Sequence, residues 1–257
     1  MINYVIKNDD VLVIENNQEY IITGAGNLTI NVPENIIAKV LLKEVSSNLT
    51  INLGNYANLN LVQFNYLENV NLKNINLNEH AYLELKDLTV SKCKDDLKIN
   101  LNGYQAECNV EYLVLNKDIE SKFDCLITHN AKETKSNINN IGLALDNSNI
   151  WFDTVCKINK GMAKSNAVQM ARGILIGEKA IITSQPVLKI DEYDVKANHG
   201  TAIGRMSDAE LFYLMSRGLS KVEAYKLILF GLINPVIDSV WNKEEAKNYS
   251  DSVTKLI

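Results

Sequence analysis

Between about residues 27 and 190, hydrophobic and polar side chains alternate in short runs along the chain. A period of two places every second side chain on the same face, which predicts β-strands with one buried face. These runs recur roughly every 10 to 20 residues, a spacing that indicates an all-β architecture. The runs cover residues 28–32, 49–53, 60–64, 70–75, 81–85, 97–101, 110–115 and 173–176.

The segments between these runs favour a solenoid over a set of tight hairpins. One Asn-Gly pair occurs at Asn102-Gly103, but other primed-turn dipeptides are scarce and the chain has only three prolines. Asparagine is abundant, and we expect it at corners between strands because it tolerates the left-handed conformation. We therefore predict a mainly-β fold in which residues 1–205 form a right-handed parallel β-helix. The irregular repeat keeps a β-sandwich as the alternative.

The pattern changes to a helical period after Gly204. Capping boxes at Ser207–Glu210 and Ser220–Glu223 predict two helix starts. We expect Gly218 to end the first helix, Pro235 to stop the second, and a third helix to begin near Val236. Residues 206–257 would thus form a small helical subdomain. A unit this short rarely stabilises itself, so it should pack on the β body or on a partner.

Composition excludes several kinds of partner. The net charge is −5 with three arginines, so no basic face is available to bind nucleic acid. No run reaches the roughly 18 apolar residues of a membrane span. The first 14 residues are acidic at Asp9 and Asp10, where a secretion signal would be basic and then apolar. We therefore expect a cytoplasmic chain.

The sequence contains no recognisable catalytic motif. The four cysteines form no C-x-x-C pair, and we expect each to be buried and inert. Phosphate-binding loops, H-E-x-x-H and G-x-S-x-G are absent. The histidines, His80, His129 and His199, are too far apart in sequence to predict a metal triad. We therefore predict no catalytic residue.

The segment that joins the last predicted strand to the helices carries a resemblance. The run from Asp191 to Leu219 resembles the C-terminal signature of the SufB/SufD family of iron-sulfur cluster assembly proteins. Further upstream, the resemblance continues through a second set of residues: Thr128-His129-Asn130-Ala131, Thr134-Lys135-Ser136, Lys160-Gly161, Ser165, Gln169 and Arg172. It covers residues 127–237 well. The sequence Val195–Gly200 resembles SufD, because SufB carries glutamate after the histidine, and SufB's catalytic cysteine has no counterpart near Gln169.

This resemblance implies a SufD-like scaffold subunit that is not itself an enzyme. Members of the family pair through their β-helices, here with a SufB-like paralogue or with a second copy, and hold a SufC-type ABC ATPase on the helical tail. The candidate docking residues are Leu211, Leu214, Met215, Leu227 and Ile228. No cofactor would be bound permanently. His199, predicted in a loop just past the last strand, becomes the candidate ligand for a transient iron-sulfur cluster at a subunit interface.

Two other functions stay open from the residues alone. A β-helix carbohydrate-active enzyme of the secreted type would need a groove of carboxylates or a basic residue on the solenoid face. A structural solenoid would need no site at all. Without the resemblance, His199 before glycine reads as a turn residue, and His129 reads as a turn cap through hydrogen bonding.

Overall fold

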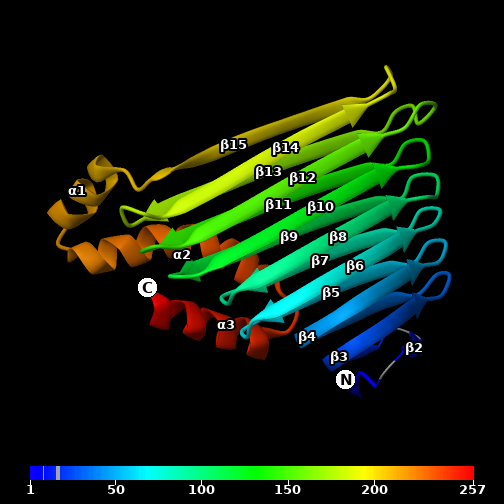
Figure 1. The fold of residues 1–257 in the computed structure, drawn as a ribbon, viewed down its shortest axis with the longest axis horizontal. Helices are drawn as coiled ribbons and strands as arrows, with labels where there is room; N and C mark the ends of the chain where they lie inside the picture. Colours follow the sequence, from blue (N-terminus) through cyan, green and yellow to red (C-terminus); the bar gives the residue numbers. More distant parts are fainter. Residues whose placement is uncertain (8, 16–17) are drawn as a thin grey trace.

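The structure is a computed structural model that describes residues 1–7, 9–15 and 18–257, and its strands wind into one parallel solenoid (Figure 1). The strands of the first coils are β1 (Ile2–Val5), β2 (Asp10–Val13), β3 (Glu19–Val32), β4 (Ile37–Leu53), β5 (Asn58–Asn65), β6 (Asn69–Leu77) and β7 (Tyr82–Thr89). The later strands are β8 (Cys93–Leu101), β9 (Glu107–Lys117), β10 (Glu120–His129), β11 (Lys135–Leu145), β12 (Asn149–Ile158), β13 (Asn166–Ile176), β14 (Ile181–Ile190) and β15 (Lys196–Arg205).

The solenoid has two faces that meet at the long strand β4. Even-numbered strands stack in the order β4, β6, β8, β10, β12, β14, and odd-numbered strands stack as β4, β5, β7, β9, β11, β13, β15. Every pairing between described strands is parallel. The predicted parallel β-helix is therefore confirmed, and the sandwich alternative is wrong.

Inward side chains stack in register from coil to coil to form the core. One row on the even face runs through Ile51, Ile75, Ile99 and Ile127, each fully buried. Because strands in a sheet lie about 4.8 Å apart, such rows place identical side chains in van der Waals contact. The alternation in the sequence thus becomes a continuous apolar column.

Asparagine side chains pair with one another from coil to coil, both along the strands and at the corners. Outward-facing asparagines form a ladder in which Asn52 donates to Asn31, Asn76 to Asn52, and Asn100 to Asn76, at 2.9–3.0 Å. Among the described non-glycine residues, those in the left-handed region at corners include only one asparagine, Asn35. Asparagines do occupy corners between strands, as predicted, and at one corner Asn130 donates to Asn102 and Asn159 donates to Asn130. The predicted left-handed conformation is wrong for all of the described corner asparagines except Asn35.

A buried charged cluster lies inside the lower coils. Lys73 Nζ lies 2.8 Å from Asp87 Oδ2 and 2.8 Å from Asp95 Oδ1, and the Tyr112 hydroxyl donates to Asp95 at 2.7 Å. Burial raises the pKa of Asp95 to about 6, against the opposing effect of Lys73. Burial alone would lower the pKa of Lys73, but the two carboxylates raise it above its ordinary value. The three charges therefore depend on one another.

Three helices follow the solenoid: α1 (Asp208–Ser216), α2 (Lys221–Ser239) and α3 (Lys243–Leu256). Ser207 and Ser220 cap α1 and α2 as predicted, each accepting a backbone hydrogen bond from the residue three positions on. Gly218, with φ +98°, lies just beyond α1, where a left-handed residue ends many helices.

The predicted helix break at Pro235 was wrong. Helix α2 continues through Pro235 to Ser239, and α3 begins at Lys243 instead of near Val236. Proline in a helix interior removes a hydrogen bond and costs about 3 kcal/mol. Packing of the buried Ile233, Val236 and Ile237 against the sheet offsets this cost.

The second half of α2 and all of α3 lie against the odd face (Figure 1). Phe64, Leu113 and Leu143 face outward from that sheet and share a buried cluster with Tyr249 and other helical residues. The Tyr249 hydroxyl also donates to the backbone carbonyl of Leu113 at 3.2 Å. The division into domains 1–205 and 206–257 stays a prediction. None of the helices in the described part of the chain is long and apolar enough to cross a membrane.

Replacing Lys73 with methionine should lower the free energy of unfolding by about 3–5 kcal/mol, because two buried carboxylates would lose their cation. Urea denaturation at pH 7 measures this change. Lys98→Met, on the exposed side of β8, is the control and should change stability by less than about 0.5 kcal/mol. A K73M protein as stable as the parent would contradict the role given to this cluster.

Candidate functional site

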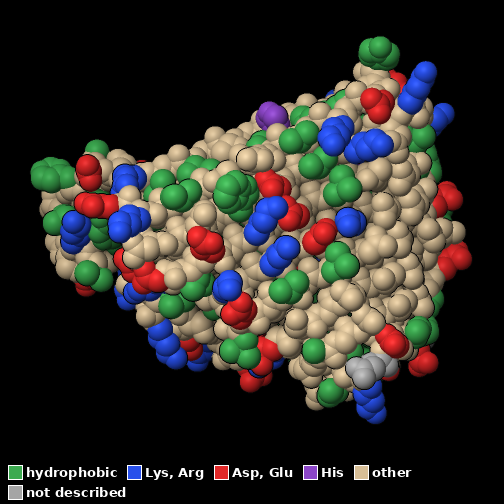
Figure 2. All heavy atoms as spheres, in the orientation of Figure 1, with side chains coloured by type: hydrophobic (Ala, Val, Ile, Leu, Met, Phe, Trp, Pro, Cys, Tyr) green, Lys and Arg blue, Asp and Glu red, His purple; other side chains and the backbone are tan. Residues whose placement is uncertain are grey.

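The first candidate site is an apolar surface on α1 and the first half of α2, the "helical arm" (residues 208–228). This arm lies beyond the ends of the strands, whereas the rest of the helical segment covers the odd face (Figure 1). Hydrophobic side chains gather at this end of the molecule (Figure 2). Apolar surface left uncovered in this way typically marks an interaction site.

The five predicted docking residues differ in exposure. Leu227 is 54% exposed and Met215 is 45% exposed, whereas Leu214 and Ile228 are half-buried and Leu211 is buried. A shallow groove of about 480 Å³ brings three of these residues together. Its lining consists of Ala209, Glu210, Tyr213, Leu214, Leu227 and Ile228. Met215 stands outside this groove, and Leu211 belongs to the interior of the arm.

Sequence reasoning missed three exposed residues of the arm. Phe212 is 75% exposed, Val222 is 60% exposed, and Tyr213 is 56% exposed. They occupy positions that an ordinary surface helix fills with polar side chains. Apolar residues on more than one face of these short helices were the signal that could have found them.

The second candidate site is His199, and the structure corrects its location. His199 lies within the terminal strand β15 and not in a loop after the last strand. It pairs in register with Gln169 of β13, and its side chain belongs to the inward-facing row that contains Val110 and Ile138. No further coil covers this row, so His199 is exposed at the open end of the solenoid.

The open end is formed by the edge strands β14 and β15 and the turn between them. Ile190, Val195 and Ile203 are only partly buried there, although they pack against the core. The Glu192 carboxylate accepts backbone hydrogen bonds from Gly161, Tyr193 and Asp194, which hold the turn and lower the pKa of Glu192. The open end therefore leaves apolar side chains accessible that a further coil would otherwise cover.

His129 is buried beneath this end and has both ring nitrogens engaged. Its Nδ1 lies 2.7 Å from Thr134 Oγ1, and its Nε2 lies 2.9 Å from Ser136 Oγ. Burial lowers the pKa of His129 to about 4, so the ring is neutral at physiological pH. The hydrogen-bonding role predicted for His129 is confirmed, in the core rather than at the surface.

The cysteines are buried and free, as predicted, namely Cys93, Cys108, Cys125 and Cys156. Burial raises the pKa of each thiol. Within residues 1–7, 9–15 and 18–257, no three His, Cys, Asp or Glu side chains form a group suited to a metal ion.

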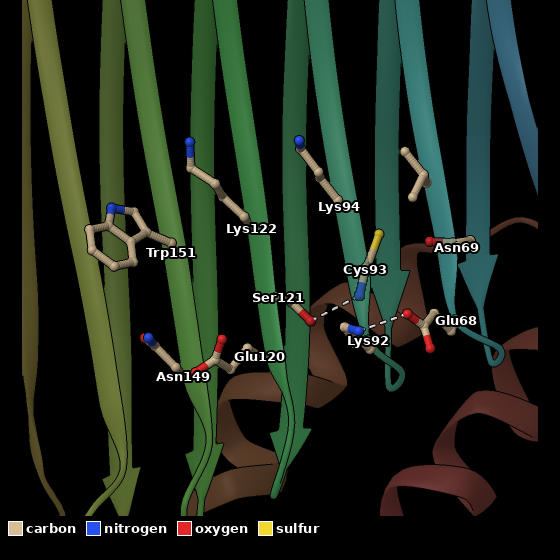
Figure 3. A pocket seen from close by; sticks show the side chains of 11 residues that line it. Glu68, Asn69, Lys92, Cys93, Lys94, Glu120, Ser121, Lys122, Asn149 and Trp151 are labelled. Carbon is tan, nitrogen blue, oxygen red and sulfur yellow. Dashed lines mark hydrogen bonds and ion pairs between the residues drawn. The ribbon is translucent and has the colours of Figure 1, made fainter.

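A groove of about 440 Å³ crosses the even face at the starts of β6, β8, β10 and β12 (Figure 3). Trp151 and Lys122 line it on adjacent strands. Lys92 lies 2.8 Å from Glu68, and Lys122 lies 2.8 Å from Asp124. Lys92 and Lys122 are therefore both in ion pairs, so neither is free to act as a general base.

A comparison with protein-family models matches most of the chain. Residues 15–232 fit the family model described as "SUF system FeS cluster assembly, SufBD core domain". This segment is more than half of the chain and contains most of the solenoid and the helical arm. The chain belongs to the SufB/SufD family. Within that family it is SufD-like, as predicted.

Three relatives illustrate this similarity. The chain is 37% identical over 142 residues to the iron-sulfur cluster assembly protein SufD of Bacillus subtilis, covering 55% of the chain and 32% of that protein. It is 31% identical over 101 residues to Protein ABCI7, chloroplastic, of Arabidopsis thaliana, covering 38% and 21%. It is 29% identical over 85 residues to SufD of Escherichia coli, covering 33% and 20%. The aligned segments span about a third or less of these relatives.

His129→Gln should change how stability depends on pH in this SufB/SufD-family chain. A histidine whose pKa falls from 6.5 to about 4 on folding stabilises the native state above pH 6.5 and loses that contribution as pH falls to 4. Between pH 7 and pH 4 the free energy of unfolding should therefore fall by about 3 kcal/mol less in H129Q than in the parent. Urea unfolding across this pH range measures the difference. His80→Gln, at a corner where the ring is half-buried, is the control, and parallel curves for the parent and H129Q would reject this assignment.

Proposed function

We propose that this chain is a SufD-like scaffold subunit that works in the cytoplasm in SUF iron-sulfur cluster assembly and catalyses no bond-making itself. The observation that carries the proposal is the exposed helical arm attached to a SufBD-type solenoid. A scaffold needs one surface for the motor that drives it and another for the subunit it pairs with. The arm and the open end of the solenoid are suited to these two roles.

The helical arm would bind a SufC-type ABC ATPase. Its groove contains Leu214, Leu227 and Ile228, and Phe212 and Val222 add exposed apolar area beside it. Interfaces gain most of their stability from buried apolar and aromatic anchors. Helix α3 and the second half of α2 are buried against the sheet, so they would hold the arm in place.

The open end would pair with a SufB-like paralogue or with a second copy of the chain. Edge strands carry unpaired backbone donors and acceptors, which readily extend a sheet across an interface. Ile190, Val195 and Ile203 would supply the apolar contact that such a junction buries. Pro186 on β14 is tolerated at an edge because this strand has only one neighbour.

His199 would contribute one ligand to a transient cluster built at that junction. A neutral imidazole binds iron well, and the exposed position of His199 at the open end leaves it accessible to a partner. The other ligands would come from the paired subunit. The cluster is cargo in this scheme, so no cofactor would be bound permanently.

The carbohydrate-active alternative finds less support. The groove on the even face has an aromatic side chain, Trp151, and two carboxylates, Glu68 and Glu120. Glu68 forms an ion pair with Lys92, so it is not free to act on a substrate. A structural solenoid would not explain an uncovered apolar arm.

Leu227→Glu should abolish co-purification with the SufC-type ATPase, because docking would bury an unpaired charge at a cost of several kcal/mol. The control is Leu67→Glu, an equally exposed leucine at a corner of the solenoid. Pull-down of the tagged chain from its native host measures binding. If L227E retains the ATPase as well as L67E does, the arm is not the docking surface.

His199→Ala should leave the fold intact and impair cluster assembly, because an exposed side chain on an edge strand contributes little packing. Activity of iron-sulfur enzymes in a strain carrying the variant measures assembly, and thermal unfolding checks the fold. His80→Asn, at a corner remote from the open end, is the control, because asparagine tolerates the left-handed backbone of this position. Normal enzyme activity with H199A would remove His199 from the proposed site.

A further inference from the structure

Gln169 lies directly beneath His199 in the same inward-facing row. It belongs to β13, pairs in register with His199 of β15, and is only 2% exposed. Side chains on the same face of neighbouring strands are separated by about 4.8 Å at the backbone, within reach of direct contact. Gln169 is thus the buried in-register neighbour of His199 in the coil below.

The amide of Gln169 is fixed on one side only. Its Nε2 donates to the backbone carbonyls of Thr154 and Val187, at 3.3 Å each, across the interior of the solenoid. Its Oε1 has no hydrogen-bond partner among the described residues, although it is buried. A buried acceptor without a partner is unfavourable, so this oxygen is available to a nearby donor.

The nearby thiol of Cys156 does not meet this need. Cys156 Sγ lies 3.8 Å from Ser136 Oγ, and no hydrogen bond joins this thiol to Gln169 Oε1 among the described residues. A thiol is also a weak donor compared with an imidazole N–H.

We propose that Gln169 is a positioning residue for His199: when the exposed imidazole turns toward the interior, the unpartnered Gln169 Oε1 accepts a hydrogen bond from one ring N–H and thereby fixes the tautomer. The other ring nitrogen then keeps its lone pair at the open end, ready to bind iron. Histidines that bind metals commonly donate their second nitrogen to a carbonyl or carboxylate in this way. This inference rests on the proposed role of His199 and adds the residue that would orient it.

The imidazole ¹⁵N chemical shifts of the isolated chain at pH 7.5 test this contact, because they report the tautomer of each histidine. Comparison with H199A assigns the His199 signals. Gln169→Met removes the acceptor at similar volume, Gln169→Glu keeps an acceptor, and Gln185→Leu on the outer side of β14 is the control. The buried His129 provides an internal check that the core is unchanged.

We expect one dominant His199 tautomer in the parent, in Q169E and in Q185L. In Q169M the preference should fall by about five- to tenfold, the factor that one net hydrogen bond of ordinary strength corresponds to. The same tautomer populations in the parent and Q169M would overturn the proposal. If Q169M failed to fold, equal populations of the two tautomers in the parent would overturn it as well.

This measurement separates the inference from the function on which it rests. The tautomer is read in the absence of iron, ATPase and partner subunit. If Q169M changes the His199 tautomer but iron-sulfur enzymes stay normal in the H199A strain, the Gln169–His199 hydrogen bond is supported and the role of His199 as a cluster ligand is rejected. If Q169M leaves the tautomer unchanged but cluster assembly is impaired in the H199A strain, the hydrogen bond is rejected and the role of His199 in assembly is supported.

Discussion

The structure depends on in-register stacking of inward side chains between consecutive coils. A row such as Ile51, Ile75, Ile99 and Ile127 is buried only because each coil covers the one before it. Burial of one methylene contributes about 0.8 kcal/mol, and the contribution repeats along every row. The final coil has no successor, so its inward residues remain accessible. The open end that exposes His199 is therefore a direct consequence of how the solenoid is stabilised.

The same burial requirement divides the helical segment into two parts. Phe64, Leu113 and Leu143 make the outer side of the odd face apolar, and that side must be covered. Helix α3 and the second half of α2 cover it. In this contact, the Tyr249 hydroxyl donates to the backbone carbonyls of Thr89 and Leu113. The helical arm is left beyond the sheet with its own apolar surface uncovered. The same helical segment is thus anchored on the sheet by its second part and leaves its first part, the helical arm, uncovered.

Polar groups inside the solenoid are tolerated where they satisfy one another. Lys73 is balanced by two aspartates, and His129 by two hydroxyls. These groups interrupt the apolar rows but specify which coils lie together, since an unpaired charge in the interior would be costly. Several buried amides keep one atom without a hydrogen-bond partner among the described residues, and that of Gln169 lies close to the open end. Its position next to His199 links the interior of the solenoid with its exposed edge.

The sequence by itself determined the strands, the parallel solenoid, the caps at Ser207 and Ser220 and the family, because period, capping and motif are local properties. Only the tertiary structure decided the course of α2 through Pro235, since packing on the sheet outweighs a lost helical hydrogen bond. It also placed His199 in an edge strand and left Phe212 and Val222 uncovered. Exposure depends on which surfaces meet across long sequence separations, and alternation along the chain carries no information about that.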